Sequence, residues 1–232
     1  MIARVHLGST MMYLRTPLHA FLIGAACAAT GCERFMAPAV VGSGVPVTLN
    51  HDVDQPYSEL EISGTLEVLA GVGDKASLAV TADDNIAPLI TVEMRGQCLA
   101  IRLKERVKPV TPIRVVMTTL PITKAACAGA VTLRLEEISA DRFEASVAGA
   151  SGMSLSGAVN ELVIDSAGAG EIDAGSLSAK KVAVTIAGAG AVDVNAVESL
   201  NVTITGAGEV NYTGDPTIEQ TIVGVGRVRK KG

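Results

Sequence analysis

Aromatic residues are scarce in this sequence. They make up 3% of its 232 residues, and tryptophan is absent. Because aromatic rings supply much of the buried area in an ordinary globular core, small and β-branched side chains must fill the interior here. The hydrophobic fraction is still 48%, and glycine is abundant at 24 residues. This composition favours narrow, regularly stacked strands over a bulky core.

Positive charge is also in short supply. The chain has 19 Lys and Arg against 24 Asp and Glu, which gives a net charge of −5. A protein that binds nucleic acid needs a positive surface to neutralise phosphates. The sequence therefore predicts no nucleic-acid partner.

Residues that commonly carry catalysis or hold metal ions are few. Beyond residue 31 the chain has one histidine, His51, and no cysteine stands in a Cys-x-x-Cys spacing. A recognisable nucleophile–base pair and the aromatic platforms of sugar-cleaving enzymes are also missing. We therefore expect no enzyme, no cofactor and no metal ion. For Cys98 and Cys127, a disulfide and two free thiols both stay open.

Acidic residues are absent from residues 1–31. In this stretch Arg15 precedes an apolar run over residues 17–29, and small residues separate that run from Cys32. This order predicts a secretory signal peptide over residues 1–31, and the run is short for a membrane-spanning helix. Three methionines are candidate starts: Met1, Met11 and Met12.

The residues Ala29-Thr30-Gly31-Cys32 resemble a bacterial lipobox, although leucine is usual where Ala29 stands. The resemblance implies cleavage before Cys32 and lipid attachment to its thiol, which makes the membrane a partner of the chain. Several acyl chains on one residue anchor a protein stably. Glu33 stands where aspartate would retain a lipoprotein in the inner membrane, which implies an outer-membrane lipoprotein facing the periplasm or the surface. An ordinary cleaved signal with an incidental cysteine is the alternative.

After the predicted signal peptide, the pattern of apolar and polar residues changes at Tyr57. Residues 32–56 contain several prolines and glycines without sustained periodicity, which predicts a lipid-anchored tether. From Tyr57 onward apolar and polar residues alternate as they do in half-buried strands. We predict a β-helix domain over residues 57–228 and a basic tail over residues 229–232.

A motif centred on glycine recurs in the second half of the chain. Counted from Gly149, its first glycines follow at steps of 19, 20, 18 and 18 residues, and another copy lies 20 residues earlier. Self-similarity at a fixed spacing indicates a solenoid, in which each coil would hold two or three short strands. Equivalent residues of successive coils would lie about 4.8 Å apart. The expected glycine ladder consists of Gly129, Gly149, Gly168, Gly188, Gly206 and Gly224.

We therefore predict an all-β fold, a single-stranded right-handed parallel β-helix with about 18–20 residues per coil. The right-handed form is favoured because the six-residue repeat of left-handed β-helices is absent. A β-sandwich can show strands at a similar spacing, but it does not require Gly-Ala-Gly at the same phase of every repeat.

The repeat resembles the head-GIN domain family. The resemblance rests on strands followed by Gly-Ala-Gly and an acidic residue with valine, and on residues 206–216 and 223–226 in particular. It covers about residues 57–228. Family members are exported bacterial proteins, often lipoproteins, that are labelled auto-transporter adhesin head domains. The resemblance implies a parallel β-helix and supplies no catalytic residues, and the molecular function of the family is not established.

Acidic residues recur just after the glycines. Stacked on successive coils, these residues and Asn211 would form a polar column able to hold a cation such as Ca²⁺. Ala191 interrupts the column, so solvated outward side chains are the simpler interpretation. The acids concerned are Glu171, Asp173, Asp193 and Glu209.

Basic residues gather at the carboxy terminus. An open coil end presents unpaired backbone groups, and charged residues there discourage end-to-end pairing. Contact with anionic lipid or glycan is the alternative interpretation. The residues are Arg227, Arg229, Lys230 and Lys231.

Together these features predict a non-catalytic cell-envelope lipoprotein whose rigid β-helix serves as a binding, adhesion or structural module. The expected partners are the membrane, through Cys32, and an envelope protein or polysaccharide. A self-assembling scaffold, in which the chain forms homo-oligomers, and a carbohydrate-active β-helix enzyme are the alternatives.

Overall fold

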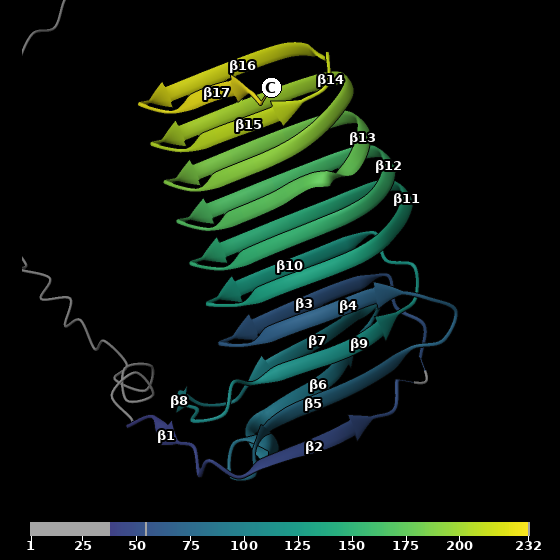
Figure 1. Cartoon of the computed structure of the whole chain (residues 1–232), viewed down its shortest axis with the longest axis vertical. Helices are drawn as coiled ribbons and strands as arrows, with labels where there is room; N and C mark the ends of the chain where they lie inside the picture. Colours follow the sequence, from purple (N-terminus) through teal and green to yellow (C-terminus); the bar gives the residue numbers. More distant parts are fainter. Residues whose placement is uncertain (1–37, 54, 232) are drawn as a thin grey trace, which may run out of the picture. The chain divides into compact units, whose positions relative to one another are not determined.

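The computed structural model describes residues 38–53 and 55–231, all within one compact unit, Pro38–Gly232 (Figure 1). The predicted signal peptide, Cys32 and the candidate start methionines lie outside the described residues. Within the described part of the chain, no helix has the length and apolar character needed to cross a membrane.

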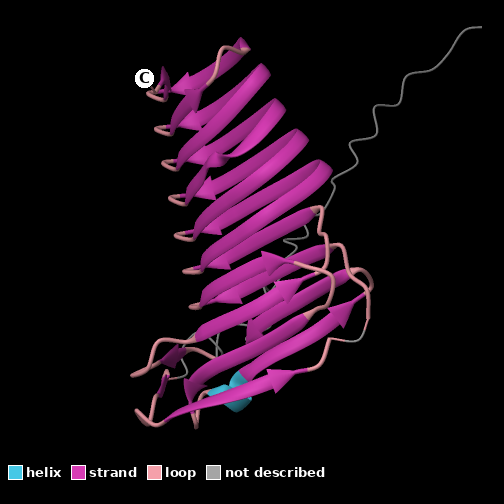
Figure 2. Cartoon of the chain, turned by 45° about the vertical axis from the view of Figure 1, so that its right-hand side comes forward, coloured by secondary structure: helices cyan, strands magenta, loops and turns pink. Residues whose placement is uncertain are grey.

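The unit is a parallel β-solenoid over most of its length. Neighbouring coils pair in parallel and lie one above the next in Figures 1 and 2. We predicted short separate strands in each coil, whereas each coil here is one strand that bends and continues. The bend is absorbed by register shifts, such as the one between Leu135 and Ile138. The four complete coils are β11 (Thr132–Gly149), β12 (Gly152–Gly168), β13 (Glu171–Gly188) and β14 (Ala191–Gly206).

Bending gives each coil two halves, which lie on opposite sides of the core. We call the sheet with the carboxy-terminal halves face A and the sheet with the amino-terminal halves face B. Face A has the order β6 (Ile90–Arg95), β7 (Cys98–Leu103), β3 (Glu59–Gly64), β10 (Lys124–Gly129), β11 to β14, and β16 (Thr217–Gly224). Face B has the order β2 (Pro46–His51), β5 (Ser77–Asp83), β9 (Arg114–Thr119), β4 (Glu67–Val72), β11 to β14, β15 (Glu209–Thr213) and β17 (Arg227–Lys230).

The amino-terminal end departs from the parallel pattern. Three strand pairs there are antiparallel: β2 with β5, β5 with β9, and β6 with β7. The short parallel pair β1 (Val40–Val41) and β8 (Val107–Lys108) and the 3-10 helix η1 (Ala87–Leu89) complete this end.

The prediction of a tether is wrong for Pro46–His51, which forms β2 at the edge of face B. Its proline misled the prediction, because a proline at the first position of an edge strand removes no ladder hydrogen bond that the sheet needs. The predicted basic tail is wrong in part as well, since β17 extends to Lys230.

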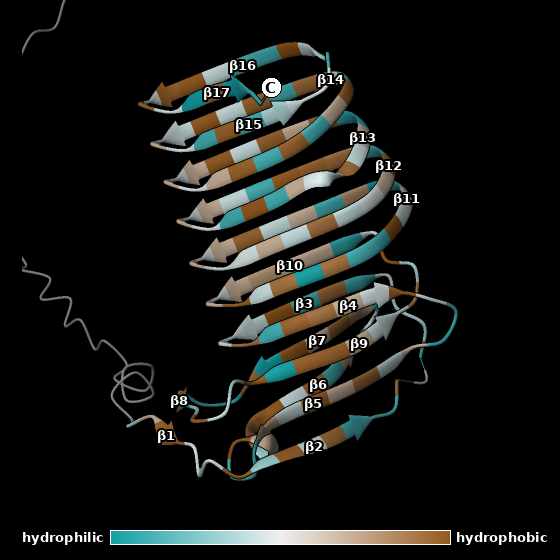
Figure 3. Ribbon diagram, in the orientation of Figure 1, coloured by the Kyte–Doolittle hydropathy of each residue, from teal (hydrophilic) through white to brown (hydrophobic). Residues whose placement is uncertain are grey.

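Alternation places one side of every strand in the core. In one column of neighbouring coils the inward residues are Leu162, Val182 and Leu200, with exposed fractions of 0%, 3% and 1%. Figure 3 shows this alternation as successive brown and teal bands along the strands. Burial of one such side chain stabilises the fold by about 1.5–3 kcal/mol. Because a single coil cannot bury its inner surface without the coils above and below it, the coils stabilise one another.

The turns between coils form a column of glycines, which Figure 2 shows as loops stacked along one edge. At Gly188, φ is 134° and an added Cβ would lie 2.2 Å from the carbonyl oxygen of Gly168. That oxygen also accepts a hydrogen bond of 2.8 Å from the backbone N–H of Ala189. A side chain is thus excluded both by the backbone conformation and by the coil beneath. The glycines in direct register are Gly64, Gly129, Gly149, Gly168, Gly188, Gly206 and Gly224.

Candidate binding faces

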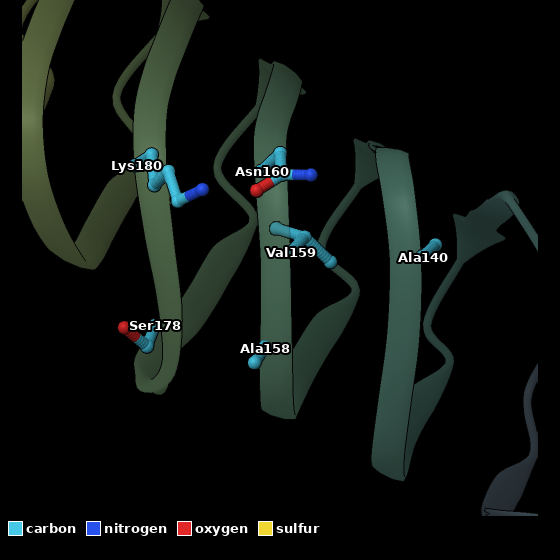
Figure 4. Close-up of a pocket in the computed structure, with 6 residues that line it drawn as sticks. All are labelled: Ala140, Ala158, Val159, Asn160, Ser178 and Lys180. Carbon is cyan, nitrogen blue, oxygen red and sulfur yellow. The ribbon is translucent and has the colours of Figure 1, made fainter.

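A shallow depression of about 300 Å³ lies where the coils bend (Figure 4). Lys180 provides the charged group in its lining, and in Figure 4 the side chain extends toward the coil that carries Asn160. One ammonium and one amide do not provide the matched acid and base that proton-transfer catalysis uses. The lining residues are Ala140, Ala158, Val159, Asn160, Ser178 and Lys180.

Face B carries the acids of the predicted cation column. The register puts Asp193 between Asp173 and Asn211. Its Oδ1 accepts a hydrogen bond of 2.8 Å from Asn211 Nδ2, and its Oδ2 lies 2.8 Å from Lys231 Nζ. Partial burial acts to raise the pKa of Asp193, but the hydrogen bonds from Lys231 and Asn211 outweigh burial and hold this pKa below its ordinary value. The Lys231 ammonium group therefore stands where a bound cation would need to be.

The other two acids of this column are separated from each other. Ala191 lies between Glu171 and Glu209 in the register, and Arg229 Nη1 lies 3.4 Å from Glu209 Oε1. Among the described residues, no three His, Cys, Asp or Glu side chains are grouped so that they could hold a metal ion. Two of the four acids, Asp193 and Glu209, thus pair with cationic side chains of the carboxy-terminal segment.

Near the bend, face A begins with long charged side chains. Arg142 Nη2 lies 3.0 Å from Glu144 Oε1, and its Nη1 contacts Glu161 of the next coil. Hydrogen bonds to Glu144 and Glu161 raise the pKa of Arg142 above its ordinary value. Exposed ion pairs of this kind add little to the stability of a fold. Their main effect here is to cover the border between coils with charge.

The carboxy-terminal part of face A differs, because its side chains are short and almost all uncharged. Of its twelve outward positions on β12, β13, β14 and β16, two are charged, Asp165 and Glu219. Inward neighbours such as Ile164 and Val202 are fully buried, so alternation fixes which residues point outward. We call these twelve positions the smooth face: Val163, Asp165, Ala167, Ala183, Thr185, Ala187, Asn201, Thr203, Thr205, Glu219, Thr221 and Val223.

The register makes the smooth face a regular grid. Neighbouring strands lie about 4.8 Å apart, and alternate residues along one strand lie about 6.7 Å apart. The turns join the coils at the edge of this grid and do not cross it (Figure 2). Its surface is therefore flat and presents mainly hydroxyl and methyl groups. One row of the grid consists of Asp165, Thr185, Thr203 and Thr221.

The smooth face was not predicted from the sequence, although part of its signal is visible there. In residues 201–205, Asn and Thr alternate with buried Val and Ile. The alternation marks these residues as outward, but only the register between coils shows that the short side chains meet in one continuous patch.

Cys98 and Cys127 are free thiols. Cys127 faces the core from β10, whereas Cys98 is half-buried on the outer side of β7. The two thiols point to opposite sides of the sheet, so a disulfide between them would require backbone movement. Burial raises the pKa of Cys127 to about 12, which keeps its thiol protonated and unreactive at neutral pH.

Comparisons with known proteins agree with this architecture. The family described as "Putative auto-transporter adhesin, head GIN domain" matches residues 56–216. A solved "putative adhesin" from Bacteroides fragilis is 20% identical, with a TM-score of 0.65 over 83% of this chain and 100% of that one. A "putative lipid binding protein" from Parabacteroides distasonis is 22% identical, with a TM-score of 0.56 over 84% and 100%. A "putative adhesin" from the same organism is 19% identical, with a TM-score of 0.55 over 84% and 100%.

At these identities the solved structures establish a shared fold. No curated protein matches the chain. The match to the family begins just before β3 and ends just before β16. It thus includes the antiparallel strands β5 and β6 and the regular coils, whereas β1, β2, β16 and β17 lie outside it.

Proposed function

Because the chain belongs to the head GIN domain family, we propose that it is a non-catalytic adhesion module of the cell envelope. In this proposal lipid on Cys32 holds the chain at the outer membrane, and the smooth face binds the partner. The family and the similar structures carry descriptions as adhesins, and their molecular function is not established. The observation that carries the proposal is the smooth face.

A flat, nearly uncharged face suits an extended partner. Charged side chains lose favourable hydration when a partner covers them, and long side chains lose rotamer freedom as well. Alanine and threonine lose little of either. Threonine hydroxyls such as those of Thr185 and Thr203 can donate and accept hydrogen bonds, which matches the hydroxyl groups of a polysaccharide and the backbone groups of an extended peptide.

The size of the smooth face indicates a weak individual contact. Four strands with three outward positions each cover about 400 Å² at the spacings of a β-sheet. A stable interface needs about 800 Å² from each partner. Many copies anchored on one membrane would, however, bind with an avidity far above the affinity of one copy. Lipid attachment at Cys32 would thereby convert a weak contact into adhesion.

Two matched threonine substitutions test the role of the smooth face. Thr185 lies in its centre, whereas Thr132 is likewise an exposed outward threonine, on face B. Thr185→Lys adds a long, charged side chain to the grid, so we expect retention of protein-coated beads on immobilised envelope fragments to fall by about tenfold or more. Thr132→Lys should change retention by less than about twofold.

The same assay identifies the partner class. Envelope fragments digested with protease keep their polysaccharide and lipid and lose their proteins, so retention on digested fragments would exclude a protein partner. Equal retention of both lysine variants would contradict binding through the smooth face. Failure of the unchanged protein to be retained on either kind of fragment would contradict the adhesion function itself.

A self-assembling scaffold is the second candidate, and the edge of β16 favours it. Among the described residues this strand pairs with β14 alone, and Ile222 and Val223 near its end are 36% and 62% exposed. An unpaired edge rich in β-branched residues is a template for another strand. A scaffold predicts a sedimentation mass that rises with protein concentration, whereas adhesion through the smooth face is compatible with a constant monomer mass.

A further inference from the structure

Three exposed valines gather at the amino-terminal end of the solenoid. Val41, Val45 and Val110 are 61%, 55% and 63% exposed. They come from two segments that are far apart in the sequence, and β1 and β8 bring these segments together. Val110 lies against the turn between the other two, since an added Cβ on Gly44 would be 3.5 Å from Val110 Cγ1. We call Val41, Val45 and Val110 the valine tip.

The valine tip is held in place by a dense set of hydrogen bonds. The buried Asp83 carboxylate accepts bonds of 2.8 Å and 3.2 Å from the backbone N–H groups of Val110 and Thr111. Asn85 donates from its Nδ2 to the carbonyl oxygen of Val41 at 2.8 Å and accepts at its Oδ1 from the N–H of Ser43 at 3.0 Å. The exposed valines are thus part of a built structure and not of a loosely held loop.

Single exposed apolar side chains are ordinary on protein surfaces, but a rigid cluster of them indicates a contact site. We propose that the valine tip contacts the lipid surface of the membrane and seats the amino-terminal end of the solenoid on it. This inference rests on the lipid anchor of the proposed function. Three valines are too few to hold a protein on a membrane unaided, so the tip orients a protein that the anchor already holds.

Chain length places the valine tip near the anchor. Cys32 precedes Pro38 by six residues and Val41 by nine. Since a chain extends by at most about 3.6 Å per residue, Val41 lies within about 32 Å of Cys32. Val223 and Val225, which are 62% and 76% exposed, belong to β16 and to the turn that follows it, and Figure 1 shows β16 at the opposite end of the solenoid. Of the two exposed valine clusters, the one at the amino-terminal end is therefore the one within the anchor's reach.

Charges around the valine tip are compatible with lipid headgroups. Lys108 is exposed and lies beside Val41 in the register of β1 and β8, where its ammonium group can reach phosphate. Of the two acids bonded to this segment, Asp83 is buried, and Asp84 accepts a hydrogen bond at its Oδ1 from Ser43 Oγ at 2.5 Å. An apolar tip with a cation beside it is the pattern expected of a peripheral membrane contact.

The absence of tryptophan from the sequence allows a direct test. Val110→Trp places a single fluorescent reporter in the valine tip, and Val225→Trp places one at the opposite end, where the side chain is also exposed. The full-length lipidated protein is reconstituted in vesicles of phosphatidylethanolamine and phosphatidylglycerol, with or without brominated acyl chains. We expect brominated lipid to quench Val110→Trp by about twofold or more and to leave Val225→Trp nearly unchanged. Val45→Trp is a second reporter of the tip, in case the first variant does not fold.

Failure of the valine tip and failure of the anchor have different signatures. Mass spectrometry of the Cys32 peptide and partition into a detergent phase report on the anchor alone. An anchored protein whose tip reporters are not quenched, or are quenched no more than Val225→Trp, would overturn the membrane contact and leave the anchor standing. An unmodified Cys32 would overturn both.

Discussion

The two ends of the solenoid are closed in different ways. A stack of coils leaves unpaired strand edges and an open core at each end. At the amino-terminal end the antiparallel strands β2 and β6 are outermost, and Ile86 and Ala87 are buried in the adjoining segment. At the carboxy-terminal end β16 and β17 continue the parallel pattern, and among the described residues they are edge strands, as β2 and β6 are.

At the carboxy-terminal end two of the core columns finish in a polar residue, whereas three others finish in Ile218, Ile222 and Val228. The inward column of Val184 and Val202 ends in Gln220 on β16, and the column of Val194 and Tyr212 ends in Lys230 on β17. A terminal repeat with polar residues keeps a solenoid soluble. A solenoid can thus end in two ways. Its last strands can adopt a new arrangement, as at the amino-terminal end, or the coil can keep its shape while some inward residues become polar, as at the carboxy-terminal end.

Substitutions in the glycine ladder should lower stability the most, and by different amounts inside the stack and at its open end. Gly188→Val puts a β-branched residue at a φ of 134°, with its Cβ 2.2 Å from Gly168 O, between coils that cannot separate. We expect the free energy of unfolding to fall by more than about 4 kcal/mol. Gly224→Val makes the same contact with Gly206, but the last coil can lift away, so we expect about half this loss. Urea unfolding followed by circular dichroism measures both.

Gly152→Val is the matched control for these variants, because an added Cβ at Gly152 has no heavy atom within 4 Å. Its unfolding free energy should change by less than about 1 kcal/mol. If Gly152→Val lowered the free energy of unfolding as much as Gly188→Val, valine would destabilise a coil at any position. The glycine ladder would then have no specific role in stability.

Isoleucine truncation compares the covered end with the open end directly. Ile86 is 0% exposed and Ile222 is 36% exposed. Ile86→Ala leaves a cavity in a closed core, so we expect the free energy of unfolding to fall by about 2–5 kcal/mol. Ile222→Ala should lower it by less than about 1 kcal/mol, since water already reaches this side chain. Equal losses in chemical denaturation would indicate that the open end is covered in solution.

The regular coils were predictable because their information is local and repeated. Spacing alone identified glycines such as Gly168 and Gly188, which the structure stacks directly. Gly64 belongs to the same column, but it follows Ser63 without the Gly-Ala-Gly motif and was missed. The alternation that predicted strands also marked outward residues such as Thr203, yet it could not show which side chains meet across coils.

The amino-terminal end was not predictable in the same way. Pro46–His51 reads as a tether in the sequence, and its pairing with β5 depends on contacts about thirty residues away. The valine tip joins Val41 to Val110, and Asp83 supports it from a third segment. Contacts of this kind occur once in the chain, so no repetition reveals them.

Acidification should loosen the amino-terminal end before the coils. Burial acts to raise the pKa of Asp83, but hydrogen bonds from Thr111 and Val110 outweigh it and hold this pKa below the ordinary value of 3.8. The stability from these bonds is therefore fully present above the ordinary value and lost as the pH falls through the lower folded pKa. We expect hydrogen-exchange protection of the Val110 and Thr111 amides to fall about tenfold across that range.

The amide of Ala207, which donates to the carbonyl oxygen of Gly188, is the internal control, because no titrating group takes part in that bond. Asp83→Asn should lower the protection of Val110 and Thr111 at neutral pH and remove most of its pH dependence. Protection that falls in parallel at all three amides would point to global acid unfolding and contradict a local role of Asp83.

The smallest expected effect concerns the polar residues that end the core columns. Gln220→Val continues the column of Val184 and Val202 to the open surface. It also removes an amide that would be buried without a hydrogen-bond partner if a second molecule stacked on this end. The end of a coil offers less area than a stable interface needs, so we expect only weak association, seen as a sedimentation mass that rises at the highest concentrations. Thr221→Val adds an outward methyl group on the same strand and should leave the mass constant. If the unchanged protein associates as strongly as Gln220→Val, polarity does not end this solenoid, and the unpaired edges of β16 and β17 are the dominant property of its open end.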